Sequence, residues 1–139
     1  HYDSARKTLY IFDEFRANKM SNAETWNTLV MTKGVTGSDL ITADSAEPKS
    51  IGDYRDYGSL CRPAIKGPDS VRYGMKWLQS LRNIVIDPVR CPNTTQEFSE
   101  YEYERTPDDE IMSSFPDANN HSIDMTRYAM ERVYKRKGQ

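Results

Sequence analysis

Two aspartates stand at positions in the chain where a carboxylate could bind a metal ion. Asp44 directly follows the strand-like residues Leu40–Ala43, and Asp124 lies in the first turn of a predicted helix over His121–Lys135. An acid at the carboxyl end of a buried strand points toward the crevice in which open α/β sheets bind ligands. Mg²⁺ and Mn²⁺ prefer hard oxygen ligands, and a pair of such ions can activate a water for phosphodiester cleavage. We therefore hypothesise that the two carboxylates meet in space and bind a divalent metal.

Each of these acids also has a simpler structural interpretation. Asp44 could cap the turn over residues 45–48, and Asp124 could complement the dipole of its own helix, whose N-terminus favours negative charge. His121 lies three residues before Asp124 on the same helical face, so it could bind metal, orient a water or contact phosphate. The same histidine could instead bond the backbone at the start of the helix. Position alone leaves these alternatives open.

Three further acids follow predicted strands. Asp87 ends a strand as Asp44 does, but Pro88 directly after it favours a role in organising a turn. Asp13 and Glu14 end the first predicted strand, where a structural role and a role in a site are equally compatible with the sequence.

The candidate DNA contacts are basic residues on one loop and on the helix behind it. Lys66 precedes Gly67 and is positioned to contact a phosphate, with Arg72 and Lys76 following in a predicted helix. For Arg72 and Lys76 the simpler interpretation is a solvated basic face. The net charge of the chain is −2, so any contact with nucleic acid must be local.

Several other kinds of site are excluded or poorly supported. The chain has no GxxxxGK[ST], HExxH or GxSxG motif, and with only His1 and His121 a Ser–His hydrolase has little support. Cys61 and Cys91 are isolated, which argues against a structural zinc site and fits reduced thiols. No apolar run approaches the ~20 residues that span a bilayer, so we expect no membrane segment.

The 139 residues suit one α/β domain in which strands alternate with helices after an antiparallel hairpin. Ser21 and Glu24 form a capping-box signal, and the helix behind them would bury Trp26, Leu29 and Val30 before ending at Gly34. The predicted strands are Thr8–Phe15, Leu40–Ala43, Cys61–Ile65 and a central Asn83–Asp87. The predicted helices are Asn22–Thr32, Ile51–Tyr57, one from Ser70 through Leu81, one opened by a capping box of Asn93 and Gln96, and His121–Lys135. Residues Tyr103–Ala118 are rich in Pro and Asp and predict a loop.

An ordered set of short segments resembles the nuclease domain of large terminase subunits, the DNA-packaging motors of tailed bacteriophages. Ile-Thr-Ala-Asp-Ser-Ala-Glu-Pro-Lys-Ser-Ile at residues 41–51 is similar to the family's second acidic motif. The other matching segments follow in the family's order: residues 8–14, 66–71, 84–88, 93–98 and 120–129. Each segment alone is weakly diagnostic, but the ordered set spans nearly the whole chain.

The resemblance implies a ribonuclease H-like fold, with a mixed sheet flanked by helices, over a single domain at residues 1–139. It implies an endonuclease that uses Mg²⁺ or Mn²⁺, as two ions, to cut concatemeric viral DNA at the initiation and termination of packaging. It makes Asp44 and Asp124 two members of an acidic triad, with His121 beside them. The implied partners are double-stranded DNA, the portal protein and the small terminase subunit, in the cytoplasm of the host bacterium and transiently at the procapsid portal.

One departure from the family concerns its first acid, which lies in a Gly-x-Asp-like segment upstream of the hairpin. Nothing in this chain matches that segment, and the chain opens with His1-Tyr2-Asp3. We therefore expect this chain to be the C-terminal part of a larger protein, with one or more N-terminal strands and an ATPase domain outside it. Two other functions stay open: a non-catalytic ribonuclease H-like module that docks the motor on its portal or on DNA, and a junction-resolvase or transposase-like nuclease.

Overall fold

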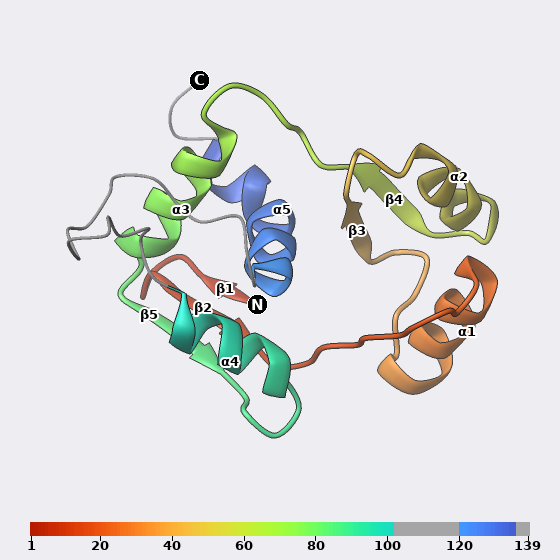
Figure 1. The fold of residues 1–139 in the computed structure, drawn as a ribbon, viewed down its shortest axis with the longest axis horizontal. Helices are drawn as coiled ribbons and strands as arrows, with labels where there is room; N and C mark the ends of the chain where they lie inside the picture. The colour runs from red at the N-terminus through yellow and green to blue at the C-terminus, as the bar shows by residue number, and fades with distance from the viewer. Residues whose placement is uncertain (102–119, 136–139) are drawn as a thin grey trace, which may run out of the picture. The chain divides into compact units, whose positions relative to one another are not determined.

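The structure, a computed structural model, describes residues 1–101 and 120–135 (Figure 1). The chain divides into two compact units. The first unit comprises His1–Glu14 and Asp69–Arg127, and the second comprises Phe15–Pro68 and Tyr128–Gln139. The last helix, α5 (His121–Lys135), therefore contributes its first half to one unit and its second half to the other.

A mixed three-stranded sheet forms the centre of the first unit. Its strands are β1 (Tyr2–Asp3), β2 (Thr8–Ile11) and β5 (Asn83–Ile86), in the order β1-β2-β5. The β1 and β2 strands pair antiparallel, which confirms the predicted hairpin, whereas β5 runs parallel to β2. Among the described strands β2 is the middle one, so the prediction of a central strand over Asn83–Asp87 is wrong.

The first predicted strand ends earlier than its apolar sequence suggested. We expected Thr8–Phe15, but β2 stops at Ile11. Beyond it, the Oδ1 atom of Asp13 accepts a hydrogen bond from the backbone N–H of Glu14 at 2.9 Å. Glu14 then turns toward α4 (Pro92–Glu100), which takes the chain out of the sheet.

The carboxylate of Glu14 is the N-terminal cap of α4. It accepts hydrogen bonds from the backbone N–H groups of Asn93 at 2.9 Å and Thr94 at 3.1 Å, and from both of their side chains. The predicted capping box of Asn93 and Gln96 is therefore wrong: the capping residue Cys91 makes no side-chain cap bond, and Gln96 donates to Glu100 instead. Burial alone would raise the pKa of Glu14, but these hydrogen bonds together lower the pKa below its usual value.

The remaining helices of the first unit are α3 and the first half of α5. Helix α3 (Ser70–Ser80) buries Met75 and Leu78 at the predicted helical spacing. Glu97 of α4 is buried and accepts a 2.7 Å hydrogen bond from the backbone N–H of Ser122, at the start of α5. A carboxylate is favourable at this end of a helix, and here it ties α4 to α5.

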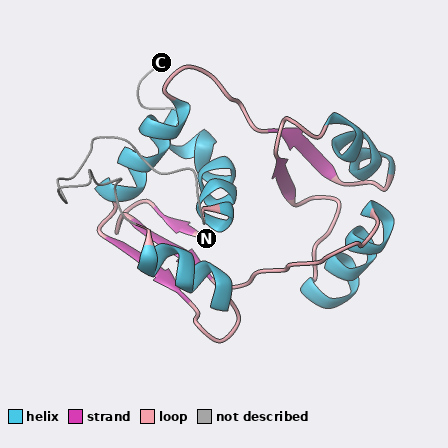
Figure 2. Cartoon of the chain, in the orientation of Figure 1, coloured by secondary structure: helices cyan, strands magenta, loops and turns pink. Residues whose placement is uncertain are grey.

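The second unit is built from α1 (Asn22–Lys33), β3 (Leu40–Ala43), α2 (Pro48–Asp56) and β4 (Leu60–Pro63). Strands β3 and β4 lie side by side and pair parallel (Figure 2). Helix α2 begins three residues before the predicted Ile51, because proline at position 48 suits the first turn of a helix. Strand β4 lies one to two residues earlier than the predicted Cys61–Ile65.

Helix α1 has the predicted ends but not the predicted burial. The capping box of Ser21 and Glu24 is present, and Gly34 ends the helix with a left-handed φ of 67°. However, α1 has no buried residue, and Val30 is exposed. Trp26 is half-buried and packs edge-on against the Tyr54 ring of α2, with 6.3 Å between the ring centroids.

A buried carboxylate on α5 holds the segment that follows β4. Glu131 is 1% exposed, and its Oε2 accepts a 2.9 Å hydrogen bond from the backbone N–H of Ile65. Lys135, one turn along α5, donates to the Ile65 carbonyl at 3.1 Å. The Nη2 atom of Arg62 faces Glu131 Oε1 at 3.7 Å. The backbone of Ile65 is thus held at both its N–H and its carbonyl.

The predicted loop Tyr103–Ala118 lies outside the described residues. Within the part of the chain that the structure describes, no helix is both long enough and apolar enough to cross a membrane. Both cysteines are buried and neither forms a disulfide; Cys61 lies in the second unit and Cys91 in the first.

Replacing Glu14 with alanine should destabilise the protein by about 1–2 kcal/mol, because two backbone N–H groups of α4 lose their acceptor. The folded-state pKa lies below the ordinary 4.5, so the contribution is complete above about pH 4.5 and is lost as the pH falls through the folded-state value. Urea unfolding across pH 3–7 measures both effects. Glu47→Ala is the control, because the Glu47 side chain makes no cap bond; equal losses in both variants would contradict the capping role.

Replacing Glu131 with alanine should cost about 3 kcal/mol of stability, because Arg62 and Lys135 would face a buried site without its negative charge. Arg132→Ala, at the next and exposed position of α5, should change stability by less than about 0.5 kcal/mol. Denaturant midpoints at pH 7 compare the two. A Glu131 variant as stable as its Arg132 control would show that the network is not stabilising.

Candidate active site

Asp44 lies in the turn that connects β3 to α2. Its Oδ1 accepts a 3.0 Å hydrogen bond from the backbone N–H of Ala46, and its carbonyl accepts the N–H of Glu47 at 3.2 Å. The interpretation of Asp44 as a turn cap is therefore confirmed. The carboxylate is about half exposed, so a turn cap in this position can also bind a cation.

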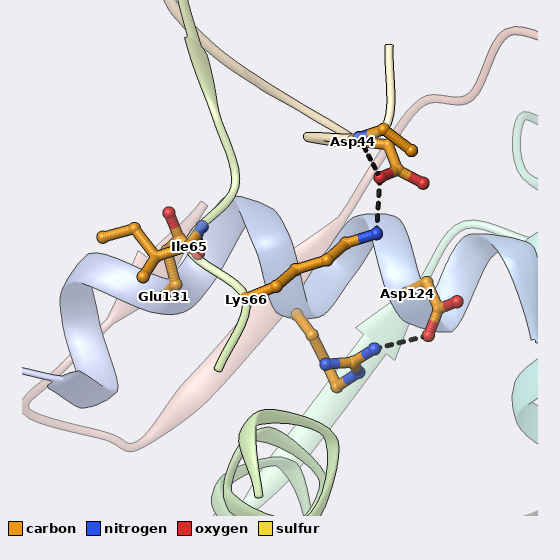
Figure 3. A network of polar contacts seen from close by, with 7 residues as sticks. Asp44, Ile65, Lys66, Asp124 and Glu131 are labelled. Carbon is orange, nitrogen blue, oxygen red and sulfur yellow. Dashed lines mark hydrogen bonds and ion pairs between the residues drawn. The ribbon is translucent and has the colours of Figure 1, made fainter. Parts of the chain in front are cut away.

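Lys66 makes an ion pair with Asp44. Its Nζ lies 2.6 Å from Asp44 Oδ1, and Figure 3 shows the lysine side chain extended toward the carboxylate. The two residues follow paired parallel strands, and the Ala64 N–H donates to the Ala43 carbonyl at 2.7 Å just before them. Parallel pairing thus brings a base and an acid 22 residues apart to the same end of the sheet. The sequence did not predict this pairing, because nothing local fixes which strands are neighbours.

The ion pair keeps both groups charged. The Ala46 N–H and then the Lys66 ammonium hold the pKa of Asp44 below its usual value. The hydrogen bond to Asp44 raises the pKa of Lys66. The two shifts agree in direction, as expected for partners of opposite charge.

Asp124 has a cationic partner of a different kind. It lies in the first turn of α5, as predicted, and its Oδ1 is 2.6 Å from Nη2 of Arg127 (Figure 3). The Arg127 side chain is only 4% exposed, whereas the Lys66 side chain is 44% exposed. His121 is exposed and is the first residue of α5, one turn before Asp124.

The other candidates separate into structural and exposed residues. Asp87 Oδ1 accepts the N–H groups of Val89 at 3.0 Å and Arg90 at 3.1 Å, which confirms its predicted role in a turn. Arg72 and Lys76 are exposed and lie four residues apart on α3. Their role in binding DNA stays a prediction.

The structure brings Asp44 together with Lys66 in the second unit, and it places His121 and Asp124 on one helix in the first unit. The meeting of Asp44 with Asp124 stays a prediction. Among residues 1–101 and 120–135, no three His, Cys, Asp or Glu side chains are grouped so that they could hold a metal. Nothing in the sequence singled out Glu131, whose partner Ile65 is 66 residues away.

Comparisons with known proteins identify the family. The family described as "Terminase RNAseH like domain" matches residues 2–132. The large terminase subunit of Bacillus phage SPP1 is 39% identical over 140 residues, which cover 99% of this chain and 33% of that protein. The PBSX phage terminase large subunit of Bacillus subtilis strain 168 is 30% identical over 129 residues, 93% of this chain and 29% of that protein. The chain spans about a third of the length of these relatives.

A solved structure agrees with these sequence relatives. The crystal structure of the g2p (large terminase) nuclease domain from bacteriophage SPP1, with bound Mn, matches with a TM-score of 0.84 and 38% identity. The match covers 96% of this chain and 75% of that one, and it confirms the predicted ribonuclease H-like fold. The chain therefore belongs to the family of terminase RNase H-like domains.

Proposed function

We propose that this chain is a metal-dependent endonuclease domain, which cuts concatemeric double-stranded DNA at the start and end of genome packaging by a phage or prophage. The observation that carries the proposal is the ionised, half-exposed carboxylate of Asp44 at the end of β3, within the second acidic motif. The related SPP1 nuclease domain has bound Mn, which supports the use of a divalent ion.

The donor groups suit a hard divalent cation. Asp44 and Asp124 offer carboxylate oxygens, and each already binds a cation of the chain itself, Lys66 or Arg127. We propose that Asp44 and Asp124 are metal ligands for Mg²⁺ or Mn²⁺, as two ions, with His121 beside them. The third acid of the family's triad has no counterpart in this chain, so these two residues are an incomplete ligand set.

The chain's own residues would bind and position the DNA. Lys66, Arg72 and Lys76 would contact phosphates, and such contacts orient a duplex without reading its sequence. His121 would orient a water or contact the phosphate next to Asp124. When bound, two divalent ions lower the pKa of the attacking water and stabilise the departing 3′-oxygen.

We also propose where the protein acts and which proteins it binds. We place the protein in the cytoplasm of the host bacterium and transiently at the procapsid portal, with the portal protein and the small terminase subunit as partners. Family membership supports this setting, because the relatives of this chain are large terminase subunits.

Asp44→Asn and Asp124→Asn should each reduce cleavage by at least about a hundredfold, because each removes a negatively charged metal ligand. The assay is plasmid nicking with Mn²⁺ by the large subunit that carries this domain. Asp53→Asn is the matched control: Asp53 also pairs with a lysine in the second unit, at 3.2 Å, but belongs to no acidic motif. It should cut like the wild type.

Unchanged cutting by the Asp44 variant would reject the nuclease assignment of this residue. If, in addition, the wild-type protein bound no Mn²⁺ in titrations, the docking-module alternative would replace the nuclease proposal. Preference for branched DNA over plasmid would favour the junction-resolvase alternative.

A further inference from the structure

We infer that Lys66 is a built-in counter-ion of Asp44, which holds the carboxylate until a divalent metal displaces it. This inference rests on the proposed function, because it assigns a regulatory role to a residue at the proposed metal ligand. It concerns only groups of the second unit, whose contacts the structure defines.

Two donors bind the same carboxylate oxygen of Asp44. Asp44 Oδ1 accepts both the Ala46 N–H at 3.0 Å and the Lys66 ammonium at 2.6 Å. A carboxylate oxygen has two lone pairs, so these two donors occupy Oδ1 fully. A metal that binds through this oxygen must displace one donor. The Ala46 donor is fixed in the backbone of the turn, so the lysine is the one that can leave.

The Lys66 ammonium would also oppose a metal that binds through the other carboxylate oxygen, Oδ2. Its charge would lie within a few Å of the Lys66 ammonium, and like charges at such a distance repel strongly near a protein surface. Metal binding at either oxygen is therefore coupled to the position of Lys66.

Contacts with helix α5 position Lys66. The preceding peptide, of Ile65, is held by Glu131 at 2.9 Å and by Lys135 at 3.1 Å. The Tyr128 ring adds a cation–π contact, with its centroid 5.7 Å from Lys66 Nζ. Glu131, Lys135 and Tyr128, all on α5, thus hold the ammonium near Asp44. Because the lysine side chain is 44% exposed, its ammonium can move into water without crossing a buried region.

The second unit contains a natural control for a general effect of charge. Lys49 and Asp53 pair at 3.2 Å across one turn of α2, and the Lys49 side chain is 87% exposed. Removing the Lys49 charge changes the net charge of the unit by the same amount as removing that of Lys66. Of these two lysines, Lys66 contacts the proposed ligand Asp44, whereas Lys49 pairs with Asp53.

The test measures the Mn²⁺ dissociation constant from the electron paramagnetic resonance signal of free Mn²⁺, at low salt, in the large subunit that carries this domain. Lys66→Met keeps the length of the side chain and removes its charge. It should tighten Mn²⁺ binding about fivefold, the factor that corresponds to a partly exposed ion pair. Lys49→Met should stay within about twofold of the wild type.

Two outcomes would overturn the inference while leaving the proposed function intact. One is that Asp44→Asn weakens Mn²⁺ binding but Lys66→Met does not tighten it. The other is that Lys49→Met tightens binding as much as Lys66→Met, which would be a general charge effect. If Asp44→Asn binds Mn²⁺ as tightly as the wild type, Asp44 is not a ligand, and both the metal assignment and the inference fall.

Discussion

The buried negative charge of Glu131 is the constraint on which the geometry around Asp44 depends. A carboxylate that is 1% exposed is stable only when the fold supplies partners, because desolvation of an unpaired charge costs several kcal/mol. The second unit supplies the Ile65 N–H, Arg62 and Lys135. Meeting this requirement fixes the peptide before Lys66, and a fixed peptide brings the Lys66 ammonium to Asp44. The partners that stabilise the buried Glu131 carboxylate thus also position the Lys66–Asp44 ion pair at the surface.

Four acids among the described residues differ in the kind of partner they have. Glu14 and Glu97 accept backbone N–H groups at the starts of α4 and α5, and they tie separate elements of the first unit together. Asp44 and Asp124 have side-chain cations as partners and are partly exposed. Backbone donors at a helix start cannot leave without unravelling the helix, whereas a side chain can rotate away. A side-chain cation that is exposed, such as Lys66, therefore suits a carboxylate that must change partners.

The partners of the two aspartates also differ from each other. Arg127 is buried, and its rigid fork of five donors suits a fixed pairing with the Asp124 carboxylate. Lys66 is half exposed and carries its charge on a flexible stem. The two motif acids are therefore equipped differently, although they belong to the same proposed ligand set.

The sequence by itself determined the features that depend on neighbours within a few residues. The capping box of Ser21 and Glu24 joins residues three apart, Gly34 provides the left-handed end of α1, and Asp87 caps the turn directly after it. The alternation of strands and helices indicated the α/β class, and the resemblance carried by the ordered segments implied the ribonuclease H-like fold and the terminase family, which the comparisons confirm.

Only the tertiary structure decided the features whose partners are distant along the chain. Glu14 caps a helix 79 residues away, Ile65 meets Glu131 across 66 residues, and Lys66 reaches Asp44 across 22. The predicted strand over Thr8–Phe15 and the predicted capping box at Asn93 both failed because Glu14 bonds to α4. A polar side chain binds whichever donor folding brings near it, and that choice depends on strand pairing and helix packing. Local sequence does not encode these contacts, so the sequence singled out Asp44 but did not predict that Lys66 pairs with it.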